Sequence, residues 1–326
     1  MNLSIITCTY NPNRAVFDRL ISSVSKLKKT NNISVEWIVV DNNSKNKIEA
    51  NFDFSNVKIP FSHVIERKPG LTAARISGIN SAKGDWLVFF DDDNEPNNNY
   101  LIESVELILN YPKVKCWGAG NINVCFEDKN VNSWVIKQKK IFQERHVIGE
   151  IIQNSEVWNE NYPQGTGQLI EKKIILDYLD KVDSGLYSLS DRKGKSLSSG
   201  GDVQIALNVI KKGYKVGVSE KLILNHNIES NKSTFEYINR LIYGMASGAI
   251  VSHQQVFPKK QSPRNISNLD VFYVFLNYLR QYKFKSLNKD NQLILAQRFG
   301  DLNAQNLASH KKTNPKLLEI FEKRYI

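Results

Sequence analysis

Short apolar runs alternate with helix-spaced apolar positions over the first hundred residues. Apolar side chains recur every three or four residues over 14–28 and 72–82, which predicts two helices. A strand that is apolar at nearly every position is buried on both faces, as in a parallel sheet covered by helices. The alternation predicts an α/β fold with a doubly wound, mostly parallel sheet. The predicted strands are Leu3–Thr9, Val35–Val40, His63–Ile65 and Trp86–Phe90.

An acidic cluster follows the second predicted helix and the fourth predicted strand. Thr72 is the expected cap of this helix, and Gly84 is expected to end it with a positive φ. The fourth strand then delivers Asp91, Asp92 and Asp93 to a loop. Three adjacent carboxylates repel one another, and Mg²⁺ or Mn²⁺ bound to them together with a diphosphate would relieve that repulsion. A solvated acidic turn is the alternative interpretation.

Polar residues also follow the first and second predicted strands. If these strands and the fourth are parallel, their carboxyl ends share one edge of the sheet, where ligands bind in open α/β folds. Thr9, Tyr10, Asn11 and Asp41 would then lie beside the acidic cluster. A tyrosine ring can stack on a base, and an aspartate can accept a hydrogen bond from a base N–H. This combination predicts a nucleotide-diphosphate pocket, while the lack of GxGxxG and Walker motifs argues against a dinucleotide site or P-loop.

Three blocks of the sequence, TCTYN, IVVDNNS and GLTAARISGINSAKGDWLVFFDDD, resemble the family 2 glycosyltransferases of GT-A fold. The resemblance implies an inverting enzyme that uses a nucleotide-diphospho-sugar together with Mn²⁺ or Mg²⁺. It implies that Asp91 and Asp93 form a DxD element, and that a metal-ligating histidine follows a later strand. The donor-binding residues implied in this way are Thr9, Tyr10, Asn11, Asp41, Arg75, Asp91 and Asp92, and the implied metal ligands are Asp93, Asp91 and His226.

Two glycine-containing turns in the second half resemble the acceptor side of the same family. One contains Gly165, Thr166 and Gly167. The other contains Gly200 and Gly201 and leads into a predicted amphipathic helix. The family has Gly-Glu-Asp at the second turn, with the aspartate as catalytic base, and the resemblance assigns that role to Asp202. This chain has Gly201 in place of the glutamate. From the residues alone, a helix cap at Asp202 is an equal alternative.

Length and charge predict two parts. The 326 residues divide into a GT-A-like domain over 1–230, with a nucleotide-sugar half at 1–100 and an acceptor half at 101–230, and a basic helical region over 231–326. The net charge is +11, and from Ser233 onward 14 Lys or Arg residues stand against 6 Asp or Glu residues. This excess predicts either peripheral contact with an anionic membrane or lipid-linked acceptor, or ordinary helix packing. No RNA-binding signature accompanies the charge, so no nucleic-acid partner is predicted.

Three cysteines without metal-ligand spacing, and no N-terminal signal pattern, indicate a cytoplasmic protein, peripheral at the inner face of a membrane if the basic region binds lipid. The predicted function is metal-dependent, inverting transfer of a hexosyl or hexosaminyl group from a UDP-sugar to a saccharide or lipid-linked hydroxyl, in surface polysaccharide or glycolipid assembly. An inactive nucleotide-sugar binder or scaffold is one alternative, motivated by Gly201. A sugar nucleotidyltransferase is another, although its glycine- and basic-rich triphosphate loop is absent from the N-terminal sequence.

Overall fold

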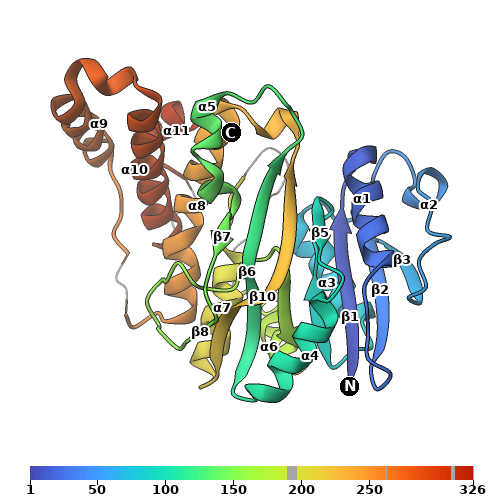
Figure 1. The fold of residues 1–326 in the computed structure, drawn as a ribbon. Coiled ribbons are helices and arrows are strands. Elements are labelled where there is room, and N and C mark those ends of the chain that lie inside the picture. Colours follow the sequence, from blue (N-terminus) through green and yellow to red (C-terminus); the bar gives the residue numbers. More distant parts are fainter. Residues whose placement is uncertain (189–196, 261–262, 310–312, 326) are drawn as a thin grey trace.

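The computed structural model describes residues 1–188, 197–260, 263–309 and 313–325, and within them the strands form one central sheet (Figure 1). The strands are β1 (Asn2–Thr9), β2 (Ser34–Asp41), β3 (Phe61–Ile65), β4 (Trp86–Phe89), β5 (Asn94–Pro96), β6 (Val114–Phe126), β7 (Arg145–His146), β8 (Glu150–Gln153), β9 (Gln168–Glu171) and β10 (Lys215–Ile228).

Helices separate and follow these strands. They are α1 (Arg14–Ser25), α2 (Ile48–Asn51), α3 (Leu71–Ser81), α4 (Tyr100–Asn110), α5 (Ser133–Ile136), α6 (Lys172–Asp183), α7 (Gly201–Lys211), α8 (Phe235–Val256), α9 (Asn268–Tyr282), α10 (Lys289–Ala308) and α11 (Lys316–Glu322), with the 3₁₀ helices η1 (Lys139–Phe142), η2 (Ser230–Lys232) and η3 (Lys283–Leu287). Figure 1 shows β1–β3 at one side of the molecule and α8–α11 at the other, with the long strands β6 and β10 between them.

The sheet order is β3-β2-β1-β4-β9-β6-β10-β5, with β7 on β6 and β8 on β10. Strands β1–β4 are parallel to one another, and β6 is parallel to β10. Strand β9 runs antiparallel between β4 and β6, and β5 runs antiparallel to β10. The fold class predicted from the sequence, a mostly parallel α/β sheet, is confirmed, and β9 joins its two parallel parts.

Alternate residues of the first strands enter two different cores. Ile5 and Trp37 pack with side chains of α1 and α4 on one face of the sheet. Their neighbours Ile6 and Ile38 pack with side chains of α3, α6 and α7 on the other face. Helices therefore cover both faces, which explains why these strands are apolar at consecutive positions.

The predicted signals at the two ends of α3 are wrong in detail. The N-cap is Gly70 and not Thr72, which lies within the first turn. Gly84 does not have a positive φ, and the helix has already ended at Ser81. A Cβ atom on Gly84 would lie 2.6 Å from the backbone nitrogen of Ser4, so this glycine permits a close approach to β1. The sequence shows the glycine but not which strand will lie against it.

Helix α8 packs on the loop that precedes α7. A Cβ atom on Gly248 would lie 1.8 Å from the carbonyl oxygen of Ser199, and the Ser252 hydroxyl donates a 3.0 Å hydrogen bond to the carbonyl of Gly200. The predicted division near residue 230 stays a prediction, but contacts across it hold the loop before Asp202. In the portions of the chain that the structure describes, no helix has both the length and the apolar character needed to span a membrane.

Candidate active site

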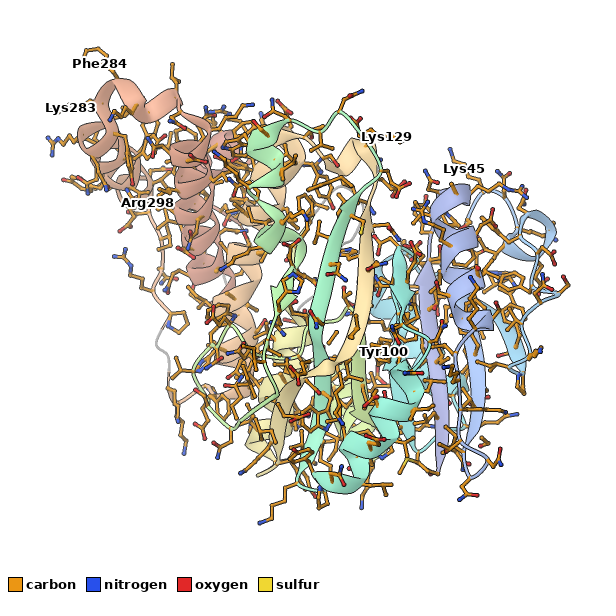
Figure 2. The ribbon with its side chains drawn as sticks, viewed as in Figure 1. Lys45, Tyr100, Lys129, Lys283, Phe284 and Arg298 are labelled. Carbon is orange, nitrogen blue, oxygen red and sulfur yellow. The ribbon has the colours of Figure 1, made fainter. Side chains whose placement is uncertain are left out.

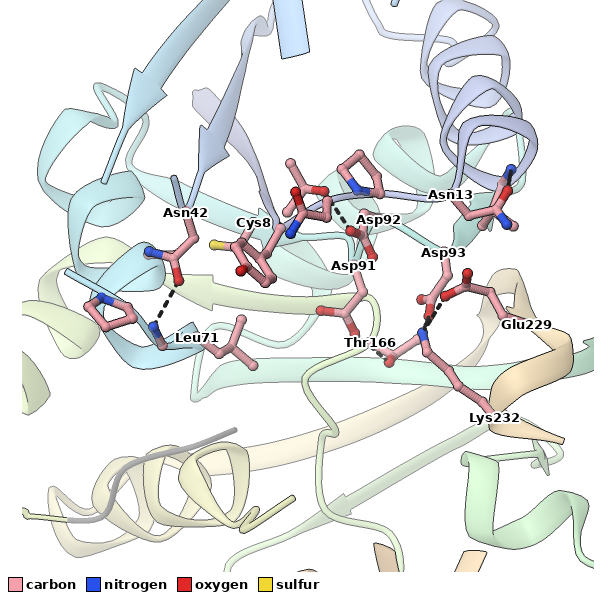
Figure 3. A pocket seen from close by; sticks show the side chains of 18 of the residues that line it. Cys8, Asn13, Asn42, Leu71, Asp91, Asp92, Asp93, Thr166, Glu229 and Lys232 are labelled. Carbon is pink, nitrogen blue, oxygen red and sulfur yellow. Dashed lines mark hydrogen bonds and ion pairs between the residues drawn. The ribbon is translucent and has the colours of Figure 1, made fainter. Parts of the chain in front are cut away.

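The carboxyl ends of β1, β2 and β4 meet at a cavity of about 630 Å³ (Figure 3). Thr9, Tyr10 and Asn11 reach it from the end of β1, Asn42 from the end of β2, and the aspartates at 91–93 from the end of β4. The parallel register, in which Thr9 lies opposite Asp41, brings these loops to the same edge. The structure thus brings together the regions that the sequence analysis placed side by side.

The three aspartates face three different partners (Figure 3). Thr166 Oγ1 donates a 2.9 Å hydrogen bond to Asp91 Oδ2, and Thr9 Oγ1 donates one of 2.6 Å to Asp92 Oδ2. Asp93 is buried and lies 3.3 Å from the ammonium group of Lys232. Each carboxylate is therefore fixed by an element distant in sequence, and the cluster is not a solvated turn.

Negative charge accumulates in this cluster. Burial raises the pKa of Asp92 to about 7, and the charge of the neighbouring Asp93 adds to that effect, while Lys232 and the hydrogen bond from Thr9 oppose it. Burial and a neighbouring carboxylate both disfavour the ionised form of a carboxyl group. A bound cation would lower the free energy of the ionised cluster.

The imidazole ring of His226 is oriented by a hydrogen bond to the backbone of another residue. Its Nδ1 donates to the carbonyl oxygen of Phe142 at 2.9 Å, which leaves Nε2 facing Asp93 Oδ1 at 3.4 Å. Burial alone would lower the pKa of His226, but the charge of Asp93 and the hydrogen bonds with Asp93 and Phe142 raise it. An imidazole fixed through one nitrogen by a backbone carbonyl, with the other nitrogen beside a carboxylate, has the arrangement of many metal-ligating histidines.

Asp93 and His226 together could provide two ligands for a divalent ion. Within the described residues, no three His, Cys, Asp or Glu side chains are gathered closely enough to hold a metal ion by themselves. Asp93 and His226 could supply two ligands, and Mg²⁺ and Mn²⁺ commonly take their remaining ligands from phosphate and water. Asp91 contacts Thr166, and its predicted place among the metal ligands stays a prediction.

Lys232 is a site residue that the sequence analysis missed. It lies in η2 and forms ion pairs with Asp93 and, at 3.0 Å, with Glu229. Burial alone would lower the pKa of Lys232, but the carboxylates of Asp93, Asp92 and Glu229 raise it, so the group stays charged. A lone lysine shortly after a predicted strand is a weak signal, and only the fold brings it to the acidic cluster.

The predicted turn at residues 165–167 connects the two halves of the site. The backbone N–H of Gly165 donates to Asp202 Oδ2 at 3.1 Å, while the next residue, Thr166, donates to Asp91. A Cβ atom on Gly165 would lie 2.6 Å from the guanidinium of Arg75, so the Arg75 side chain lies directly against this glycine. The turn therefore connects Asp202 with Asp91, and Arg75 packs against it.

Asp202 is the second residue of α7 and is not its N-cap. The N-cap is Gly200, which has a φ of 148° and no side chain to cap with. Asp202 lines a small cavity together with Arg75, Asp91 and Gly165. Its Oδ1 accepts a 2.8 Å hydrogen bond from the backbone N–H of Val203 in the first turn of α7, so Asp202 still satisfies an amide at the start of the helix. Its predicted role as the catalytic base stays a prediction.

The second strand ends with one buried and one cavity-lining residue. Asp41 is 4% exposed, accepts a 2.8 Å hydrogen bond from the backbone of Ser44, and is not among the residues that line the cavity. Asn42 lines it, donates to the carbonyls of Glu66 and Lys68 and accepts from the N–H of Gly70. Asn42 therefore holds the loop before α3, a role that the sequence analysis did not assign.

Comparison with known proteins gives the family of the chain. Residues 4–179 match the model of the family described as Glycosyl transferase family 2, which is more than half of the chain. The protein belongs to glycosyltransferase family 2, as the sequence blocks suggested. Among solved structures, the crystal structure of S. aureus TarS, residues 1–349, is similar with a TM-score of 0.48 and 13% sequence identity, covering 96% of this chain and 93% of that chain. No curated protein matches the chain.

Proposed function

We propose that this glycosyltransferase moves a hexosyl or hexosaminyl group from a UDP-sugar to a hydroxyl group of a saccharide or lipid-linked acceptor, with inversion and with Mn²⁺ or Mg²⁺ bound. The observation that carries the proposal is the turn at 165–167, because it joins Asp91 of the donor cavity to Asp202 through consecutive residues. A nucleotide-diphosphate cavity with a carboxylate at its end matches the needs of a direct displacement. Surface polysaccharide or glycolipid assembly is the proposed setting.

The residues divide the reaction between them. Tyr10 is 61% exposed beside the cavity and offers its ring to the base. Asp202 takes the proton of the acceptor hydroxyl as its oxygen bonds to the anomeric carbon, and the nucleoside diphosphate leaves with the electron pair of the broken bond. The ammonium of Lys232 neutralises part of the charge that develops on the diphosphate. A divalent ion held by Asp93 and His226 would supply further charge neutralisation there.

Turnover is the test of this proposal. The chain is incubated with Mn²⁺ and a panel of UDP-, GDP- and dTDP-sugars, and release of the nucleoside diphosphate is measured with and without a mixture of saccharide acceptors. We expect UDP release that rises when acceptors are added. Nucleotide binding without any release would instead identify an inactive binder, as the glycine at position 201 first suggested.

The base pocket gives a first prediction. We propose that Asp41, which precedes the cavity-lining Asn42, accepts a hydrogen bond from the uracil N–H, so Asp41→Ala is expected to weaken UDP binding by about 1.5–3 kcal/mol. Isothermal calorimetry of UDP with both proteins measures this difference. The structure adds a second possible cause, since Asp41 also fixes the backbone of Ser44.

Asp53→Ala is the matched control. The Asp53 carboxylate likewise accepts a 2.8 Å hydrogen bond from the backbone of a nearby serine, Ser55, but Asp53 is exposed and lies in the loop before β3, whereas Asp41 ends β2 next to the cavity-lining Asn42. Its loss should leave UDP affinity unchanged. Equal UDP affinity in Asp41→Ala and the native protein would reduce Asp41 to a turn residue.

We also propose that the C-terminal region contacts an anionic membrane, and this can be tested directly. The 3₁₀ helix η3 presents Phe284, which is fully exposed, and Leu287, with Lys283 and Lys285 beside them. Figure 2 shows Lys283 and Phe284 at the outer end of the C-terminal helices. Basic residues near an anionic surface contribute about 1 kcal/mol each, and exposed apolar side chains can enter the interface.

Sedimentation with phosphatidylglycerol vesicles checks this prediction. The native chain should bind at low salt and release at high salt, and the double variant Lys283→Glu/Lys285→Glu should bind weakly. Lys45→Glu/Lys58→Glu makes the same change of charge at exposed positions of the N-terminal half and should bind like the native chain. Vesicle binding that changes neither with salt nor in the Lys283→Glu/Lys285→Glu variant would refute membrane contact through η3.

A further inference from the structure

A second groove of about 150 Å³ opens beside the donor cavity. One wall comes from the segment 140–164, and the other from α8, which contributes Tyr237, Leu241, Met245 and Ala249. Asp202 lines this groove, and Asp93, His226 and Lys232 line both it and the donor cavity. A molecule in the groove therefore lies between the candidate base and the group that leaves.

An exposed tryptophan lines the groove. Trp158 is 62% exposed although it is large and apolar. Its loop is fastened on both sides, since Arg145 donates to the carbonyls of Glu160 and Tyr162, and His253 of α8 bonds the carbonyl of Glu156 at 2.7 Å. An aromatic ring that is open to solvent on a loop with a fixed backbone is a suitable surface for the apolar face of a sugar.

Two glutamines that line the same groove each have a side-chain acceptor without a hydrogen-bond partner among the described residues. The Oε1 atoms of Gln143 and Gln164 are buried and have no hydrogen-bond partner in the described parts of the chain. Gln143 ends η1 with a φ of 73° and lines the donor cavity as well as the groove. Buried acceptors without partners cost free energy, which a ligand rich in hydroxyl donors would recover.

We propose that this groove binds the acceptor, and that the acceptor is a saccharide whose terminal sugar lies on Trp158 and donates hydroxyl hydrogen bonds to Gln143 and Gln164. The inference rests on the proposed function and names its second substrate by class. The groove is small compared with the roughly 300–1,000 Å³ of pockets for drug-sized ligands, so it suits a terminal sugar unit and not a lipid chain. Helix α8 of the C-terminal region thereby becomes part of the acceptor site.

The test measures saccharide binding separately from donor binding. The labelled chain is applied, with UDP and Mn²⁺, to an array of mono- to tetrasaccharides, and the dissociation constant of the best ligand is measured for each variant. Trp158→Ala is expected to weaken this affinity about tenfold or more and to leave UDP affinity unchanged. Tyr273→Ala, which removes an aromatic ring of similar exposure (59%) on α9, should change neither affinity.

A second variant separates binding from folding. Gln164→Leu removes the unused acceptor while roughly keeping the size of the side chain, so thermal stability without ligand should not fall, whereas saccharide affinity should fall several-fold. Equal saccharide affinity in all variants, or no saccharide bound while UDP binds, would overturn the acceptor proposal alone. Alkyl glycosides give a further test. If their affinity changes with the length of the alkyl chain and not with the identity of the sugar, the acceptor proposal is overturned in favour of a lipid. If no nucleotide binds, the proposed function itself fails.

Discussion

Asp202→Asn is expected to lower kcat by about 10²–10⁴-fold, with donor affinity nearly unchanged. An acceptor hydroxyl is a poor nucleophile until its proton is being removed, and a general base accounts for this range of rate. Asparagine keeps an oxygen that can accept the hydrogen bond from the Gly165 amide, so the turn at 165–167 should stay in place. Steady-state kinetics with the donor and acceptor found in the turnover test, together with calorimetry of UDP, measure both quantities.

Asp180→Asn is the matched control for this prediction. Asp180 is an exposed aspartate on α6 that has no glycine turn before it and does not line the donor cavity or the groove. Its replacement should leave kcat unchanged. Near-native kcat in Asp202→Asn would show that the hydrogen bond to Gly165 is structural and that another residue accepts the proton.

Asp93→Asn is expected to weaken Mn²⁺ binding by more than roughly 10–100-fold, which is the cost of losing a residue that only hydrogen-bonds a metal ligand. It is also expected to lower kcat by at least about 10²-fold. Asp93 is the carboxylate that faces both His226 and Lys232. The fold should survive because Lys232 retains its ion pair with Glu229. Electron paramagnetic resonance of free Mn²⁺ measures the binding without any need for turnover.

Asp177→Asn provides the comparison. Asp177 also pairs with lysines, Lys181 and Lys212, at 2.7 Å each, but it joins α6 to the end of α7 away from the cavity. This variant is expected to lose some stability and to keep its Mn²⁺ affinity. Unchanged Mn²⁺ affinity in Asp93→Asn would remove Asp93 from the metal site, and full activity after treatment with a chelator would remove the metal from the reaction.

The sheet is largely predictable from the sequence because its strands carry their own signal. Strands buried on both faces are apolar throughout, so β1, β2 and β4 appear within a residue or two of their observed bounds. The antiparallel strand β9 has no such signature at four residues long. Its place between β4 and β6 depends on pairings that only the tertiary structure establishes.

Some residues of the site can likewise be recognised from the sequence, and others cannot. The aspartates at 91–93 are recognisable because a carboxylate triplet directly behind a buried strand is unusual, and Asp202 because two glycines precede it. Lys232 and Gln143 have no such context. Lys232 reaches the site through its ion pair with Asp93, and Gln143 lines a cavity whose other residues come from distant parts of the sequence. Single polar residues of this kind can be assigned only after the fold has brought them together.

Thermal unfolding of the chain with UDP and Mn²⁺ tests the central claim most directly, because it needs neither the right sugar nor the right acceptor. A ligand at a hundredfold excess over its dissociation constant stabilises the native state by about 2.7 kcal/mol. We predict that UDP and Mn²⁺ together raise the unfolding temperature more than either alone, and that Asp93→Asn loses most of this joint effect. No stabilisation by UDP with Mn²⁺, or the same shift in Asp93→Asn, would contradict a metal-bound nucleotide-diphosphate site at the ends of β1, β2 and β4.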